Sequence, residues 1–235
     1  MQESNLEKIL ENQKLRKSVV CLTNIDTAEE IILLKGESSK IEDLDQEISQ
    51  CIRFDISKLV TINGKNYFID VYNPPLKLII IGAVHIAQYL VDFAQNLSFD
   101  CKLIDPREGF ANRERFPNTE IYNNWPDEVM ESMDIDNRTA IVTLTHDPKI
   151  DDVALDFVLK KDCFYIGSLG SKKTHAARVE RLLAKFSNED IQKIHAPIGI
   201  DIGARSPSEI ALSIISEIIL SLRKYKICHE NCEKK

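Results

Sequence analysis

The hydrophobic and polar positions of the chain follow two different patterns, one before and one after residue 75. In the first part, apolar residues recur at helical spacing, then in short strands, then at helical spacing again. The predicted elements fall at residues 6–15, 18–24, 30–35, 41–52, 59–62 and 67–71. Asn63-Gly64 separates the last two and is typical of a hairpin turn. We therefore expect a small α+β domain over residues 1–73.

Beyond Asn73-Pro74-Pro75, a stiff segment that marks the boundary, strands alternate with helices. The strands are continuous apolar runs, as expected for strands buried on both faces. They fall at residues 76–81, 101–104, 121–122, 140–144 and 163–166, and the helices at 85–97, 126–133, 151–159, 172–186 and 207–225. This alternation predicts a Rossmann-like α/β domain, a parallel sheet with helices on both faces, over residues 76–227, followed by a tail at 228–235.

Composition narrows the class of protein. The chain of 235 residues is 43% hydrophobic and 29% charged, which suits a soluble globular protein. A net charge of −7, with both signs interspersed, argues against a nucleic-acid partner, because such a chain gains nothing from counterion release. The most apolar stretch, residues 210–220, contains Glu217 and is too short to span a membrane. The opening residues lack the apolar core of a secretory signal, so we expect a cytoplasmic protein without disulfides.

A glycine turn follows the first strand of the larger domain. In residues 78–87, LIIIGAVHIA, a buried strand leads through Gly82 to a helix that begins at His85, and both residues are candidates for cofactor binding. Backbone N–H groups at such a helix start can hold a phosphate, and Asp105, after the next strand, stands where a ribose hydroxyl would lie. Val84 occupies the second small-residue position of this motif, where it obstructs a pyrophosphate. The alternative is a turn without a ligand, with Asp105 capping a loop.

Arginines follow in the loop after the second strand. Arg107, Arg113 and Arg115 can each offer a planar, bidentate partner to a phosphate or carboxylate. Surface pairing with the adjacent Glu108 and Glu114 is the alternative interpretation.

Polar residues also follow the strand predicted at 140–144. His146 and Asp147 stand where ligands bind in open α/β sheets, beyond the carboxyl end of a strand. The carboxylate of Asp147 can fix the tautomer of the His146 imidazole, for acid–base work or to orient a ligand. Capping of the next helix is the alternative role for Asp147.

The most specific motif is a Gly/Ser loop that leads into the helix predicted at 172–186. Free N–H groups at this helix start would hold an anion. The candidate residues are Gly167, Ser168, Gly170, Ser171 and Lys172. Lysines in a first turn oppose the helix dipole, and a bound anion would relieve that repulsion. The alternative is a flexible loop capped by Ser171.

Two features near the carboxyl terminus favour structural roles. The wide apolar stripe over residues 210–222 predicts a core or dimer contact. Cys228, His229 and Cys232 have no second ligand cluster nearby, so we expect a frayed tail and predict no metal site.

Six motifs occur in an order and spacing that resemble the XdhC/CoxI family of xanthine dehydrogenase accessory proteins. They are GAVH at 82–85, DPRE at 105–108, ERFP at 114–117, TLTHD at 143–147, IGSLGSKKTH at 166–175 with Arg178, and PIGIDIGA at 197–204. The resemblance covers about residues 76–220. Two departures stand out, because the family usually has Gly where Val84 stands and many members carry a Gly-Gly-Cys stretch that residues 1–72 lack.

The resemblance implies a cofactor-binding chaperone rather than an enzyme. Members of the family bind the molybdenum cofactor, protect it and help insert it into a molybdenum hydroxylase such as xanthine dehydrogenase. It implies a pterin-nucleotide ligand near Gly82, Asp105, His146 and the loop at 167–171. A cysteine desulfurase partner and a homo-oligomer are further expectations. The alternatives from other classes are an NAD(P)-binding oxidoreductase and a regulatory module that senses a nucleotide and acts through its amino-terminal domain.

Overall fold

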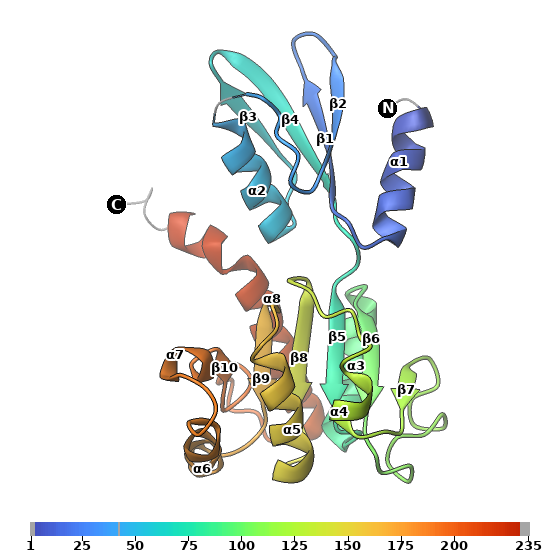
Figure 1. Cartoon of the computed structure of the whole chain (residues 1–235), viewed down its shortest axis with the longest axis vertical. Coiled ribbons are helices and arrows are strands. Elements are labelled where there is room, and N and C mark those ends of the chain that lie inside the picture. The colour runs from blue at the N-terminus through green and yellow to red at the C-terminus, as the bar shows by residue number, and fades with distance from the viewer. Residues whose placement is uncertain (1–2, 42, 231–235) are drawn as a thin grey trace. The chain divides into compact units, whose positions relative to one another are not determined.

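The computed structural model describes residues 3–41 and 43–230, with side chains over 5–41 and 43–223. The chain divides into two compact units, Met1–Pro74 and Pro75–Lys235, and each is described by itself (Figure 1). The side chains of Cys228, His229 and Cys232, for which a frayed tail was predicted, lie outside the described residues.

The amino-terminal unit is a four-stranded antiparallel sheet with the order β2-β1-β4-β3 and two helices. Its elements are α1 (Glu3–Lys14), β1 (Val19–Asn24), β2 (Glu30–Leu34), α2 (Leu44–Phe54), β3 (Lys58–Ile62) and β4 (Lys65–Tyr72). The predicted hairpin turn is present, with positive φ at both Asn63 and Gly64. Leu44 and Ile48 of α2 pack with Ile69 of β4 in the core of this unit.

The second unit contains a six-stranded parallel sheet with the order β10-β9-β8-β5-β6-β7. Its strands are β5 (Lys77–Ile81), β6 (Asp100–Ile104), β7 (Glu120–Tyr122), β8 (Thr139–Thr143), β9 (Tyr165–Ser168) and β10 (Ile194–His195). Every residue of β5 and β8 is buried, as the continuous apolar runs predict.

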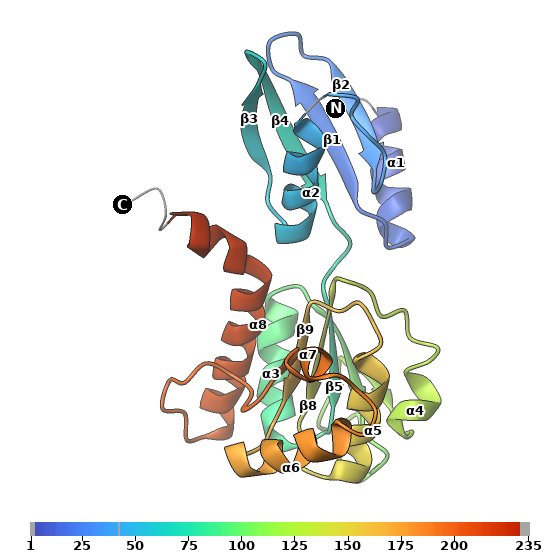
Figure 2. The same cartoon turned by 60° about the vertical axis from the view of Figure 1, so that its left-hand side comes forward.

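Helices cover both faces of this sheet (Figures 1 and 2). They are α3 (His85–Asn96), α4 (Pro126–Val129), α5 (Pro148–Val158), α6 (Lys172–Leu182), α7 (Asn188–Ile191) and α8 (Pro207–Glu230). Leu78 of β5 shares one core with α3 and α8, whereas Ile79, on the opposite face, shares another with α5, α6 and α7. The predicted Rossmann-like fold is thus confirmed. Sequence reasoning missed α7 and β10, and α4 is shorter than the helix predicted at 126–133.

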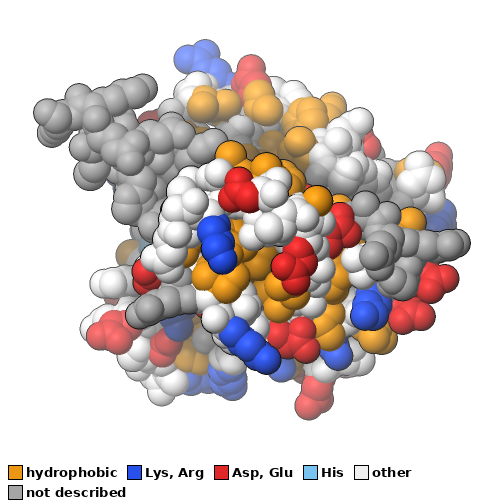
Figure 3. Space-filling view, turned by 90° about the horizontal axis from the view of Figure 1, so that it is seen from above, with side chains coloured by type: hydrophobic (Ala, Val, Ile, Leu, Met, Phe, Trp, Pro, Cys, Tyr) orange, Lys and Arg blue, Asp and Glu red, His pale blue; other side chains and the backbone are white. Residues whose placement is uncertain are grey.

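Charges are intermixed on the face shown in Figure 3, where Lys and Arg side chains alternate with Asp and Glu among apolar patches. Among the described helices, none is both long enough and apolar enough to cross a membrane.

Candidate functional site

The predicted motifs meet at one edge of the parallel sheet. All neighbouring strands run in the same direction, so their carboxyl ends lie on a common edge, which is the lower edge in Figure 1. The strand order reverses at β5 and β8, and ligands of open α/β sheets bind at such a switch point. The turn after β5, at Gly82, lies against the loop after β8, at Thr145. The loops that carry the polar motifs therefore lie on the same edge of the sheet.

The turn after β5 requires a glycine because the neighbouring loop lies so close. Gly82 has a φ of +110°, and a Cβ there would lie 2.6 Å from Cγ2 of Thr145. Its N–H donates to the carbonyl of Ile104 at 2.8 Å. Val84 is the N-cap of α3 with an ordinary φ of −78°, and His85 is exposed at the first position of this helix.

Asp105 connects the end of β6 to this turn. Its carboxylate is completely buried and accepts the N–H of Ala83 at 2.8 Å and the N–H of Arg107 at 3.0 Å. The Arg107 guanidinium donates twice more, from Nε at 2.8 Å and Nη2 at 2.7 Å. Burial opposes ionisation, but these hydrogen bonds hold the pKa of Asp105 below its usual value. The carboxylate therefore organises the loop, and a ribose hydroxyl would have to displace Arg107 from it.

Of the three arginines of this loop, Arg113 is exposed, and the other two have different roles. Arg107 is 36% exposed, stacks on the Phe110 ring at 4.5 Å and pairs with Asp105, not with Glu108. Arg115 instead holds the loop in place, since its Nη1 donates to the carbonyls of Ala83 at 2.7 Å and Phe110 at 2.6 Å. Of the two, Arg107 is the one with donors open to solvent at the carboxyl edge.

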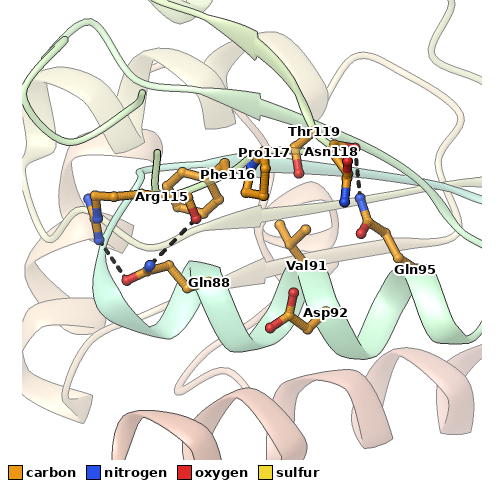
Figure 4. Close-up of a pocket in the computed structure, with 9 residues that line it drawn as sticks. All are labelled: Gln88, Val91, Asp92, Gln95, Arg115, Phe116, Pro117, Asn118 and Thr119. Atoms are coloured by element: carbon orange, nitrogen blue, oxygen red, sulfur yellow. Dashed lines mark hydrogen bonds between the residues drawn. The ribbon is translucent and has the colours of Figure 1, made fainter. Parts of the chain in front are cut away.

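A cavity of about 250 Å³ lies between α3 and the segment at 115–119 (Figure 4). Polar side chains bridge the two walls, as Gln88 pairs with Arg115 and Gln95 with the carbonyl of Asn118. Arg115 lines this cavity, whereas Gly82, Asp105, His146 and the loop at 167–171 do not, so we do not include the cavity in the candidate site.

The loop after β8 is organised by Asp151, which sequence reasoning did not select. This buried carboxylate accepts the Thr145 hydroxyl at 2.6 Å and the backbone N–H of His146 at 3.1 Å. Asp147 is the N-cap of α5 and accepts the N–H of Lys149, so the alternative capping role is the one that the structure gives it. His146 has a φ of +63°, and within the described residues its exposed imidazole makes no hydrogen bond.

Strand β9 lies two residues later than the strand predicted at 163–166, so the Gly/Ser motif begins inside it. The Ser168 side chain is buried and its hydroxyl pairs with that of Thr143 on the neighbouring strand. A Cβ on Gly167 would overlap Ile198, so this glycine is required for packing. Both residues were predicted to bind an anion, but their side-chain positions serve the sheet and its core instead.

The loop proper consists of residues 169–171 and leads into α6. Ser171 is the N-cap, and its hydroxyl accepts the N–H of Thr174 at 3.1 Å. In the described part of the chain, the backbone N–H groups of residues 170–173 donate to no protein acceptor. Lys172 and Lys173 are exposed beside them. Anions bind at helix starts of this kind.

Two buried nitrogen atoms of α6 lack a partner among the described residues. Arg178 is only 2% exposed, and its nearest carboxylate oxygens, on Asp152 and Asp151, lie 3.4 and 3.6 Å away. Its Nη1 atom and Nδ1 of His175 are both buried and form no hydrogen bond. Burial and the Arg178 charge lower the pKa of His175. Buried polar atoms without a hydrogen bond are uncommon in folded proteins, and each calls for a partner such as water or a ligand.

Cysteines do not contribute to this edge in the described residues. Cys21 and Cys51 are buried in the amino-terminal unit, whereas Cys101 lies near the start of β6 and Cys163 precedes β9, both at the amino ends of their strands. Burial raises the pKa of Cys101 to about 12 and that of Cys163 to about 11, so neither is a ready thiolate. The described residues contain no cluster of three His, Cys, Asp or Glu side chains that could hold a metal ion.

Comparison with known proteins gives a consistent result. Residues 78–218 match the family model of the XdhC Rossmann domain. A probable xanthine dehydrogenase subunit of Bacillus subtilis (strain 168) is 28% identical over 163 residues, covering 69% of this chain and 48% of that protein. The molybdenum cofactor insertion chaperone PaoD of Escherichia coli (strain K12) is 29% identical over 148 residues, covering 63% of this chain and 40% of PaoD.

Two further matches extend this result. The uncharacterised protein YqeB of Escherichia coli (strain K12) is 32% identical over 157 residues, which are 65% of this chain and 28% of YqeB. The crystal structure of a xanthine dehydrogenase from Bacillus halodurans has a TM-score of 0.73 and 26% identity, and the match covers 96% of this chain and 68% of that one. The chain therefore spans less than half the length of the three curated relatives.

Proposed function

Because the chain belongs to the XdhC family, we propose that it binds the molybdenum cofactor at the carboxyl edge of its sheet and assists the transfer of this cofactor to a molybdenum hydroxylase. The cofactor is cargo in this proposal, and the chain is a binding protein rather than a catalyst. Two relatives carry names in keeping with it, a molybdenum cofactor insertion chaperone and a probable xanthine dehydrogenase subunit.

The observation that carries the proposal is a set of backbone N–H groups at the start of α6 that have no hydrogen-bond acceptor in the described chain. The N–H groups of residues 170–173 have no acceptor within the described chain, and exposed Lys172 adds a positive charge beside them. The unpartnered buried nitrogens of Arg178 and His175 lie further along the same helix. The N–H groups at the helix start and the Lys172 ammonium offer hydrogen bonds to an anionic group, and the phosphate of a pterin nucleotide supplies one.

The same geometry disfavours NAD(P). Asp105, where a ribose hydroxyl would bind, is fully buried and already accepts four donors. Val84 places a branched side chain where a dinucleotide-binding turn needs a small residue. A ligand held through the start of α6 avoids both positions.

The residues present fit the organic part of the cofactor and not its metal. Cys101 and Cys163 lie away from this edge, and the residues described at the edge offer contacts to the phosphate and the ring of the cofactor. A cargo held in this way keeps its metal free for the receiving enzyme. The client, a molybdenum hydroxylase such as xanthine dehydrogenase, is part of the same proposal.

Calorimetry with molybdenum cofactor released from a purified molybdenum hydroxylase tests the binding step. We expect Lys172→Ala to weaken binding about tenfold at low salt and less at high salt, since its contribution is electrostatic. Lys160→Ala is the matched control. Lys160 is also an exposed lysine, but it follows the end of α5, and this helix begins at the carboxyl edge and runs away from it. Equal affinities of both variants and the parent protein would refute the site at α6.

A further inference from the structure

A cavity of about 390 Å³ lies directly beside the start of α6. Its walls are the segment at 197–204, Leu169 and Lys172 at the entrance to α6, and Ile210 and Ser213 of α8. Figure 2 shows this segment as the loop between β10 and the lower end of α8. The volume falls within the range of about 300–1,000 Å³ that small-molecule sites occupy.

The loop that forms this cavity is held in one conformation by α8. Glu217 accepts the N–H of Gly199 at 2.7 Å, and the same carboxylate accepts the Tyr165 hydroxyl at 2.6 Å and lies 3.0 Å from Nδ1 of His195. Gly199 has a φ of +96°, and a Cβ there would overlap Ser213. The loop therefore forms the cavity before any ligand arrives, which lowers the entropic cost of binding.

This rigid loop presents apolar side chains to solvent. Ile200 is 37% exposed and Ile202 is 51% exposed, although both border a cavity next to the core. Polar groups occur only at a few positions of the lining, where Lys172 and Asp201 are exposed. Apolar walls with a few polar groups are typical of small-molecule sites, and they suit a flat ring with a polar edge.

We propose that this cavity receives the flat heteroaromatic ring of a phosphorylated ligand whose anionic group rests on the start of α6. The inference rests on the proposed function and identifies where the ring of the ligand binds. Leu169 and Lys172 border the cavity and belong to the loop and first turn that carry the uncovered N–H groups, so one ligand reaches both places. The ring packs between isoleucines, and its polar edge faces Lys172 or Asp201.

A pterin and a nucleobase share this ring chemistry, and the test distinguishes them. The full chain is titrated with 6-hydroxymethylpterin, with cytidine and guanosine monophosphate, and with pyrophosphate, which has no ring. We expect Ile202→Ser to lower the affinity for the ligand whose ring occupies the cavity about tenfold, or by about 1.4 kcal/mol, because half of this side chain is available for contact. Ala204→Phe should fill the cavity and lower this affinity further. Pyrophosphate binding stays unchanged in both variants.

Leu212→Ser is the matched control, because Leu212 is 48% exposed on α8 and does not line the cavity. If the two cavity variants lose affinity for the pterin alone, the cavity binds a pterin ring. If they lose affinity for the nucleotides alone, it binds a nucleobase. The inference is overturned if the variants bind both rings like the parent protein, or if the parent protein binds neither. Failure of the proposed function would give a different result, because the affinity for pyrophosphate would then be the same in Lys172→Ala as in the parent protein.

Discussion

Replacement of Asp105 by asparagine tests whether this residue stabilises the loop around the site or serves only to bind a ligand. The buried carboxylate joins the N–H of Ala83 to both the N–H and the guanidinium of Arg107. Asparagine keeps one acceptor oxygen and turns an amide N–H₂ toward these donors. The variant therefore loses the charge and leaves at least one buried donor without an acceptor.

The magnitude follows from these contacts. Charge-assisted hydrogen bonds contribute about 1.5–3 kcal/mol each, and roughly two are lost. Arg107 is 36% exposed, so water replaces part of its interaction and lowers the total to about 2–4 kcal/mol. For a unit of this size, about 2–4 °C per kcal/mol gives a drop of about 5–15 °C in the Tm of the larger unit.

The effect also depends on pH in a defined direction. The pKa of Asp105 is lowered in the folded protein, so its contribution is complete above about pH 4, the ordinary value of the unfolded chain, and is lost as the pH falls below it. The difference between the parent protein and Asp105→Asn should therefore shrink on acidification. Thermal unfolding followed by circular dichroism measures it. Asp100→Asn, an exposed change at the start of the same strand, is the control, and equal Tm losses in the two variants would refute the reasoning.

Three other predictions concern packing and titration. Gly82→Ala should lower the free energy of unfolding by about 2 kcal/mol or more through clash and positive φ, while Gly109→Ala, with open space around it, should change it by less than about 1 kcal/mol in urea titrations. Gly167→Ala should lower the free energy of unfolding by about 1–3 kcal/mol, because its Cβ would overlap Ile198. In a double-mutant cycle, adding Ile198→Ala should recover part of that loss, and strictly additive effects would contradict the packing role. NMR titration should place the pKa of His175 below its ordinary value of about 6.5, because burial and a neighbouring guanidinium disfavour its charged form, and a midpoint above that value would contradict the described burial.

The pattern of apolar residues was sufficient to predict the parallel sheet and its edge. Continuous apolar runs such as residues 78–81 have no polar face, which is typical of strands buried on both sides. The glycine turn at Gly82 and the hairpin at Asn63-Gly64 were likewise predictable, because both depend on positive φ at a fixed position. A two-residue strand such as β10 carries no periodicity, and sequence reasoning therefore missed it.

Partner choice among polar residues was not predictable in the same way. Asp147 and Asp151 both stand near the end of β8, and only the start of α5 decides that the first caps the helix while the second holds the loop. The position of Ser168 depended on where β9 ends, and a shift of two residues turned a candidate ligand into a cross-strand partner of Thr143. Such outcomes depend on tertiary packing rather than on local sequence.

A native mass spectrum of the full chain, purified from a molybdenum-replete host, tests cofactor binding with the fewest assumptions. We predict a bound mass that corresponds to a pterin nucleotide, and we predict that it decreases in Lys172→Ala but not in Lys160→Ala. A spectrum of the bare chain, or of the chain with NAD(P), would contradict the proposed function.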